Sequence, residues 1–559
     1  MGLGLAAGGQ ASAGGPRVAQ GRVVFPVGAG AGTGTESSGG ASQVVALPSG
    51  GAVLVGGGGR GQRGFYAAEL TASGSLDASF GRGGIVRVGV DSPPSRPLEV
   101  LRQVDGKLVV VVSGRETTAF SFGQLLVVRL DADGSLDRTF GSQGIATTPL
   151  APACDSCRPA GLAPDGDIFL TGEAGQLSAA LGGDPSAAGV WNVVALTRSG
   201  GLDQAFGQGG QETIGATDAG GYDLSVLPSG EVMTLGMDNI QSPVSSTAIL
   251  TLLGPDGGAD RRFNGGVPVG LPAGVPAGAM LVRPDGSVVV GGGTGLFDYT
   301  ASGHADAGFG DGGVAHVGAL PEGLELLTGA GGGLLAVGRV AGAPGTVGGL
   351  RVSASGRAES SSGGPAQIRF RPHFGGGGSG ATGGGSSRVV RGLVQDSFVE
   401  RAVAARADGS YLAVGGVGVV EGSANGRVRG RSVFEFAAAS ITPGFTEDAG
   451  FGGRPARVGL KLSVPAQSAA GALAARAIRV RLDFSAVGLA RVRIKAGGHV
   501  IAQGVVGIFG RGPQILGIGL SGYGAHVLAG RRPVVVRATG TGRDLVTAGA
   551  SVSAPGRLD

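Results

Sequence analysis

One phrase, Gly-x-Leu-Asp-x-x-Phe-Gly in its fullest form, recurs along the chain and restricts the fold more than any other feature. Successive phenylalanines of the first five copies are 60, 66, 57 and 46 residues apart, and a shortened copy, Gly450-Phe451-Gly-Gly, follows after 142 more. Such a repeat indicates one supersecondary unit per copy, stacked so that neighbours bury each other's apolar faces. The five pairs are Asp77 and Phe80, Asp137 and Phe140, Asp203 and Phe206, Asp260 and Phe263, and Asp306 and Phe309.

A second phrase, Asp-Gly or Ser-Gly followed by an apolar run, recurs out of phase with the first. Asp105-Gly106 is typical, because it separates the apolar runs at 98–104 and 107–112. Asp-Gly in this setting is a strong hairpin signal, since glycine tolerates the positive φ that tight turns require. With a degenerate copy at 331–338, seven units carry the phrase; the other six are centred on Gly50, Gly106, Gly166, Gly230, Gly286 and Gly409.

Four strands are expected in the second unit, at 85–90, 98–104, 107–112 and 125–130. No segment shows a sustained 3.6-residue apolar period, so few helices are expected. Seven units of four short antiparallel strands predict an all-β protein with a seven-bladed β-propeller, and a flat solenoid is the competing architecture. The apolar run at 23–27 is similar to the 85–90 element, and we expect it to complete the last blade and close the ring.

Composition fits this architecture better than it fits disorder. Glycine supplies 119 of the 559 residues, about three times the usual ~7 %. A collagen helix is excluded because no strict Gly-X-Y period exists, and full disorder is disfavoured because 42 % of the residues are hydrophobic. The net charge is only +4 without a basic block, so no nucleic-acid partner is expected.

The two phrases together resemble the bacterial delta-60 repeat family. The resemblance extends over residues 45–315, where five units carry the Asp-x-x-Phe phrase, and units six and seven depart from it. It implies a repeat-built, propeller-like and exported protein, and it implies no defined reaction.

The repeats occupy residues 21–457 and are interrupted by a Gly/Ser-rich insertion at 363–388, which is expected to be a flexible loop. Residues 1–20 are expected to be a flexible N-terminus or the remnant of a truncated signal peptide, because Ala11-x-Ala13 lacks a basic segment before it. We therefore expect an extracellular or cell-surface location. No apolar run is long enough for a transmembrane helix.

Residues 458–559 have a different pattern from the repeats. The runs at 477–484 and 490–495 alternate apolar and polar residues, as half-buried strands do, and 534–539 is a shorter β-branched run. The region is similar in style to the Ig-like domains appended to many exported proteins. This predicts a small C-terminal β-sandwich.

The repeated aspartates could in principle ring an ion, but repetition in five successive units favours a structural role. Each carboxylate is expected to accept backbone N–H groups in a turn while the following phenylalanine fills the blade. The segment 131–137 superficially resembles a calcium loop but lacks the twelfth-position glutamate. Cys154 and Cys157, the only cysteines, supply two of the four ligands that a structural zinc needs. We expect a local disulfide, and no metal or cofactor.

The sequence offers no set of catalytic residues. The leading hypothesis is an exported, non-enzymatic binding or scaffold protein, monomeric, whose partner is an extracellular protein or glycan. One alternative is a propeller hydrolase or lyase with its site at the central channel, because a fold does not determine a function. The other is a self-associating wall or surface protein. Small apolar residues around the channel would exclude the enzyme.

Overall fold

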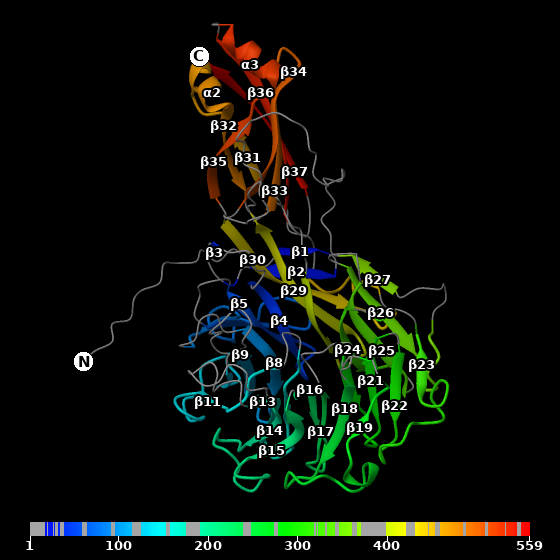
Figure 1. Ribbon diagram of the computed structural model, residues 1–559. Helices are drawn as coiled ribbons and strands as arrows, with labels where there is room; N and C mark the ends of the chain where they lie inside the picture. The colour runs from blue at the N-terminus through cyan, green and yellow to red at the C-terminus, as the bar shows by residue number, and fades with distance from the viewer. Residues whose placement is uncertain are drawn as a thin grey trace, which may run out of the picture.

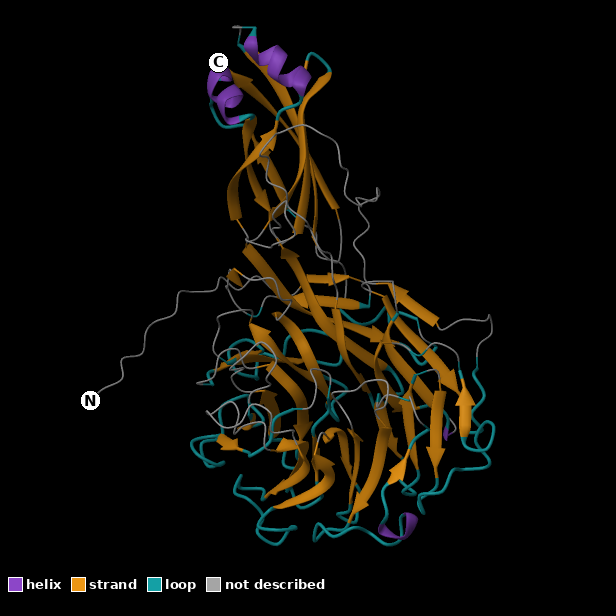
Figure 2. Cartoon of the chain, viewed as in Figure 1, coloured by secondary structure: helices purple, strands orange, loops and turns teal. Residues whose placement is uncertain are grey.

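The computed structural model has an almost entirely β architecture (Figures 1 and 2). No helix in the described part of the chain is long and apolar enough to cross a membrane. The described residues are 17–19, 21–25, 27, 32–33, 39–58, 64–90, 96–113, 124–152, 157–174, 190–217, 219–238, 247–272, 275, 278–293, 295–317, 320, 322–329, 332–340, 346–359, 366–369, 399–420, 431–444, 446–452, 459–484, 488–508, 512–530, 533–544 and 549–559.

Six antiparallel sheets of four strands follow one another along the chain. The first three comprise β4 (Gly39–Ala46), β5 (Ala52–Gly58), β6 (Phe65–Leu70) and β7 (Ile85–Val88); β8 (Arg96–Arg102), β9 (Leu108–Ser113), β10 (Leu125–Leu130) and β11 (Ile145–Thr147); and β12 (Ala160–Leu162), β13 (Ile168–Ala174), β14 (Val190–Leu196) and β15 (Gln211–Thr217). The next three comprise β16 (Ala219–Val226), β17 (Val232–Asp238), β18 (Thr247–Leu253) and β19 (Val269–Gly270); β20 (Ala279–Val282), β21 (Val288–Gly292), β22 (Gly295–Tyr299) and β23 (Val314–His316); and β24 (Glu322–Thr328), β25 (Leu334–Arg339), β26 (Thr346–Val352) and β27 (Ala366–Arg369).

The next sheet joins the two ends of the repeat region. Its strands are β28 (Val399–Ala405), β29 (Tyr411–Val420), β30 (Arg431–Ile441), β2 (Arg22–Phe25) and β1 (Arg17–Ala19), and β3 (Gly32–Thr33) also pairs with β30. Antiparallel pairing of β2 with β30 places Arg22 opposite Ala439. The predicted pairing of the run at 23–27 with the last repeat is therefore present. A flat solenoid would leave its first and last units apart, so this pairing excludes it.

The first strand of each sheet contacts the first strand of the next, from β4 through β8, β12, β16, β20, β24 and β28 and back to β4. These inner strands therefore surround a common centre, which is the arrangement of a β-propeller. The central strands of the sheets are apolar on both faces because neighbouring sheets cover them; the side chains of Leu108–Val112 in β9, for example, are all buried.

Each repeated Asp-x-x-Phe-Gly segment, here called a corner, attaches its sheet to the next one. The backbone N–H that follows the phenylalanine donates to a turn carbonyl of the next sheet at 2.6–2.9 Å, as Gly81 N does to Asp133 O. The phenylalanine ring is fully buried, and in most copies it lies within 3.3 Å of where a Cβ would stand on a turn glycine of that next sheet. The pairs are Phe80 with Gly134, Phe140 with Gly200, Phe206 with Gly257, Phe263 with Gly303, and Phe451 with Gly74.

Three expectations about boundaries differ from the structure. The strand expected at 85–90 is β7 and belongs to the first sheet, because the corner at Asp77–Gly81 returns the chain to pair with β6. The fourth strand of the second sheet is β11.

Two segments that were expected to be flexible contain strands. Strand β1 lies inside the N-terminal range 1–20, and β27 lies inside the expected loop 363–388, where it pairs with β26.

The C-terminal region forms two further sheets that share one hydrophobic core. Figure 1 shows this orange and red region at one end of the molecule, beyond β29 and β30. The strands expected at 477–484, 490–495 and 534–539 lie in β32 (Ala477–Phe484), β33 (Gly488–Ala496) and β36 (Val534–Asp544). One sheet comprises β31 (Leu460–Ser463), β32 (Ala477–Phe484) and β35 (Gly512–Gly519); the other comprises β34 (His499–Ile508), β33 (Gly488–Ala496), β36 (Val534–Asp544) and β37 (Gly549–Leu558).

Two short helices complete the C-terminal region (Figure 2). They are α2 (Ala469–Ala475) and α3 (Gly522–Ala529), and each begins with a serine N-cap, Ser468 or Ser521, whose hydroxyl accepts a backbone N–H of the first turn. The 3-10 segment η1 (Asn264–Gly266) lies in the propeller.

Candidate functional site

The repeated aspartates are distributed over the corners of different sheets and do not converge. In the first copy Ser79 N donates to Asp77 Oδ1 at 2.9 Å. The equivalent bonds, 2.8–3.0 Å long, join Thr139 to Asp137, Ala205 to Asp203, Arg262 to Asp260, and Gly308 to Asp306. Within the described residues no group of three or more His, Cys, Asp or Glu is placed to hold a metal ion. The aspartates thus shape turns. They do not come together to form a shared ion-binding site within the described residues.

Asp137 is the most strongly bonded of the five aspartates. Its carboxylate accepts hydrogen bonds from Lys107 Nζ at 2.9 Å, Arg129 Nε at 2.7 Å and Thr139 Oγ1 at 2.6 Å. Burial alone would raise the pKa of Asp137, but these donors together hold it well below its usual range. Asp137 is therefore ionised at neutral pH.

Three other carboxylates, which the sequence analysis did not single out, occupy one equivalent position in alternate sheets. Glu99 in β8, Asp223 in β16 and Glu325 in β24 each stand seven residues before the glycine of the following hairpin turn. Each is only 5–7 % exposed. A shift in strand register immediately precedes each one, and such bulges redirect a side chain out of the regular alternation.

Arg158 completes this group, which we call the central cluster. It precedes β12 and lies at the third inner strand, between those of Glu99 and Asp223. Arg158 Nε is 3.6 Å from Glu99 Oε2, and the Arg158 side chain is 37 % exposed whereas that of Glu99 is 6 % exposed. All three carboxylates act on the pKa of Arg158, which places the four charges around the same centre.

The central cluster also connects neighbouring sheets. Met280 N of β20 donates to Asp223 Oδ2 at 2.9 Å, and the backbone N–H of Val403 in β28 donates to Glu325. Arg158 N donates to Tyr222 O at 2.9 Å. Part of the hydrogen-bonding capacity of these groups is therefore structural. Glu99 Oε2 differs, because it is buried and has no hydrogen-bond partner.

The acids of the central cluster are difficult to ionise. Burial raises the pKa of Glu99 to about 7; Arg158 opposes the shift, and Asp223 and Glu325 add to it. Burial likewise raises the pKa of Glu325 to about 7 and that of Asp223 to about 6, again against the effect of Arg158. Burial lowers the pKa of Arg158, but the three carboxylates raise it by more, so the guanidinium keeps its charge. The cluster can exchange protons near neutral pH.

One cysteine of the expected pair lies next to this cluster. Cys157 is buried, disulfide-bonded and directly precedes Arg158. Cys154, the other cysteine of the chain, lies outside the described residues, so its pairing with Cys157 stays a prediction. Trp191 is fully buried in β14 and donates its indole N–H to Thr171 Oγ1 at 2.8 Å.

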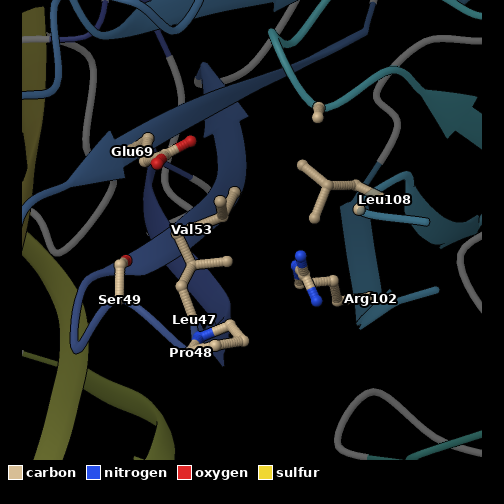
Figure 3. Close-up of a pocket in the computed structure, with 9 residues that line it drawn as sticks. Leu47, Pro48, Ser49, Val53, Glu69, Arg102 and Leu108 are labelled. Atoms are coloured by element: carbon tan, nitrogen blue, oxygen red, sulfur yellow. The ribbon is translucent and has the colours of Figure 1, made fainter. Parts of the chain in front are cut away.

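A separate cavity of about 230 Å³ lies between the first two sheets (Figure 3). Glu69 stands on one side of it, and Arg102 and Leu108 stand on the other. Burial raises the pKa of Glu69, Asp77 adds to this, and Arg102 opposes it. The remaining lining is short or apolar, and no lining side chain is among the buried unpaired groups of the described chain. We therefore regard the central cluster as the stronger candidate site.

A comparison of the seven hairpin phrases in register could have revealed the three carboxylates of the central cluster, but not that they meet. Where Glu99, Asp223 and Glu325 stand, the other four copies have Gln43, Pro159, Ala279 and Ala402. Carboxylates that recur in only three copies are not needed by the repeat itself. Nothing in the sequence indicates that they face Arg158, because that depends on closure of the ring.

Two segments of the chain, residues 51–80 and 103–140, match the family model described as "Domain of unknown function (DUF5122) beta-propeller". Both contain a corner of the repeat. Together with the ring of inner strands, the match defines the chain as a β-propeller protein. No curated protein matches the sequence at a significant level.

Several solved structures are similar to part of this chain in their backbone fold. A puromycin hydrolase is 15 % identical with a TM-score of 0.36, and the match covers 74 % of this chain and 60 % of that one. A glucose dehydrogenase is 16 % identical (TM-score 0.32; 55 % and 96 % covered). An endo-1,5-α-L-arabinanase from Thermotoga petrophila RKU-1 is 10 % identical (TM-score 0.29; 75 % and 98 % covered). The chain thus spans about 60 % of the length of the hydrolase, and values this low carry no inference about ligand or reaction.

Proposed function

We propose that this chain is an exported, non-enzymatic binding module of the delta-60 repeat type. In this proposal residues 21–457 form a seven-bladed propeller closed by β1 and β2, and residues 458–559 form an Ig-like β-sandwich appended to it. The partner is an extracellular protein or glycan, and the module is a monomer. The disulfide bond of Cys157, whose proposed partner is Cys154, supports export, because disulfides persist in oxidising compartments.

The observation that carries this proposal is the buried Glu99 Oε2, which accepts no hydrogen bond and has Arg158 Nε 3.6 Å away. Leaving a buried acceptor unpaired costs about 1–3 kcal/mol, so a group retained only for stability would be expected to have a partner. A ligand that supplies the missing donor explains why the acid is placed there. The partner would therefore reach the propeller at its centre.

Co-sedimentation with isolated bacterial cell envelopes tests this function. The wild-type protein is expected to sediment with the envelopes, and the double variant Glu99→Gln/Arg158→Ala is expected to remain in the supernatant. Asp311→Asn, a change of an exposed corner carboxylate, serves as the matched control and should behave as the wild type. Equal sedimentation of all three folded proteins would show that the centre does not bind the partner.

A hydrolase or lyase is the second candidate, and one observation favours it. Glu99 and Glu325 have pKa values raised to about 7 and Asp223 to about 6, and acids that titrate near neutrality suit general acid–base catalysis. Small apolar residues around the channel would have excluded an enzyme, but carboxyl groups stand there as well. An enzyme is therefore not excluded. Release of p-nitrophenol from a panel of p-nitrophenyl glycosides and esters, abolished by Glu99→Gln and by Glu325→Gln, would replace the binding proposal.

A further inference from the structure

Resting on the binding function proposed above, we propose that the central cluster binds a primary ammonium group carried on a slender chain, such as a lysine side chain or a short diamine. Three properties of the cluster point to this ligand. They are its charge balance, its unpaired acceptor and the unequal exposure of its members.

The charge balance favours a cation. Three carboxyl groups surround one guanidinium, and Glu99, Asp223 and Glu325 each interact with Arg158. With all four groups ionised, one positive charge is opposed by three negative ones. A buried charge is costly unless it is paired, so the cluster has unused capacity for a second cation.

The unpaired acceptor specifies a hydrogen-bond donor. Glu99 Oε2 is 3.6 Å from Arg158 Nε, which is an ion-pair distance but too long for a hydrogen bond. The same oxygen is buried without any other partner. An ammonium group offers three donors and a full charge in a small volume, and it can satisfy this oxygen as a charge-assisted bond.

Exposure limits the shape of the ligand. The Glu99 side chain is only 6 % exposed, whereas the Arg158 side chain beside it is 37 % exposed. So small an accessible area on Glu99 favours a narrow ligand, and a linear alkyl chain that ends in an ammonium group is narrow. A bulky ring would need more accessible area than Glu99 offers.

Ammonium binding at this site is expected to depend on pH. The charged groups that face Glu99 in the described chain are Arg158, Asp223 and Glu325. An alkylammonium stays protonated below pH ~10, whereas Glu99 and Glu325 lose their protons around pH 7. Binding should therefore strengthen by about tenfold from pH 6 to pH 8 and should release protons.

Isothermal titration calorimetry with matched five-carbon probes tests the inference on the full chain. The probes are 1,5-diaminopentane, neutral 1,5-pentanediol and anionic glutarate, and Nα-acetyl-lysine amide distinguishes a protein side chain from a free diamine. We expect 1,5-diaminopentane to bind and the other two five-carbon probes not to. Glu99→Gln should weaken its binding by about tenfold or more. Asp311→Asn should leave it unchanged.

Each alternative outcome overturns the assignment. Equal binding of pentanediol at pH 6 and pH 8 would indicate a neutral polyol ligand. Binding of glutarate that Arg158→Gln abolishes would indicate an anion. If 1,5-diaminopentane does not bind while the envelope co-sedimentation still requires Glu99 and Arg158, the ammonium assignment fails and the proposed function stands. If the co-sedimentation does not require them, the proposed function itself fails.

Discussion

The corners and the centre of the propeller use charged residues in opposite ways. At the corner of the second sheet, Asp137 is held by Lys107, Arg129 and Thr139, and its pKa lies below the usual range. At the centre, Glu99 is buried with an oxygen that accepts no hydrogen bond, and burial raises its pKa to about 7. One carboxylate is stabilised as an anion by its surroundings, and the other is destabilised as an anion.

This difference distinguishes residues that every repeat requires, such as those of the corner, from residues that occur in only some repeats, such as the central carboxylates. The corner recurs because every sheet must be attached to the next one, and its aspartate, phenylalanine and glycine each have a geometric role there. The central carboxylates occur in three of the seven copies, so a sheet of the ring can form without one. Residues that depart from the repeat are therefore the better indicators of function in this chain.

The largest expected effect comes from removing a corner phenylalanine. Phe140 is fully buried between the second and third sheets, and the Arg129 guanidinium lies 4.6 Å from its ring centre. Phe140→Ala should lower the free energy of unfolding by about 3–5 kcal/mol, because it leaves a cavity at a junction between sheets. Urea denaturation followed by the fluorescence of Trp191, the only tryptophan, reports on the propeller.

Phe140→Leu is the matched control and should cost less, because it fills most of the cavity. A loss below about 1 kcal/mol for Phe140→Ala would show that the corners do not hold the ring.

The second largest effect has the opposite sign and concerns the centre. The pKa of Glu99 is raised from 4.5 to about 7 on folding. Between these values the folded state binds the additional proton, so the contribution of Glu99 to stability falls as the pH rises through this window. Glu99→Gln should therefore stabilise the propeller by about 3 kcal/mol at pH 8 and leave it nearly unchanged at pH 4. Thermal denaturation at the two pH values measures this, and a destabilised variant at pH 8 would contradict it.

The corners could be predicted from the sequence, and the centre could not. Asp77, Phe80 and the equivalent residues of the other copies stand at fixed spacings because each copy forms the same turn. Their pattern can therefore be recognised in the amino-acid sequence. The closing pair of β2 with β30 was also predictable, since the run at 23–27 has the character of an outer strand. The proximity of Glu99 to Arg158 depends on where two strands of different sheets meet around an axis, and no local pattern encodes that distance.

A third prediction compares two corner aspartates that have the same backbone bond. Asp137 has additional bonds to Lys107 and Arg129, whereas Asp203 accepts from Ala205 N and has no ion pair within the described residues. Asp137→Ala should cost about 2–3 kcal/mol at pH 7, and Asp203→Ala about 1 kcal/mol. The lowered pKa of Asp137 means that its contribution is present above pH ~4 and is lost as the pH falls below that value.

Urea midpoints of the two variants at pH 7 and pH 3 provide the measurement. The difference between the variants should shrink at pH 3, and an equal cost of both substitutions at pH 7 would refute the role of the cations.

The smallest expected loss of stability comes from replacing glycines beside the corners. It distinguishes two reasons for glycine there, a left-handed backbone and a close contact with a phenylalanine ring. Gly83 has φ +66° and open space around it, whereas Gly134 has φ +84° and a Cβ there would lie 2.8 Å from the Phe80 ring of the preceding sheet. Gly83→Ala should cost about 1 kcal/mol for the left-handed backbone alone, and Gly134→Ala about 2 kcal/mol because the ring must also shift. The double variant Gly134→Ala/Phe80→Leu should show less than additive loss, since the smaller side chain relieves the clash, whereas Gly83→Ala/Phe80→Leu should be additive. Additivity in both cases would mean that glycine at 134 serves only the turn, and that the corner does not couple adjacent sheets through this contact.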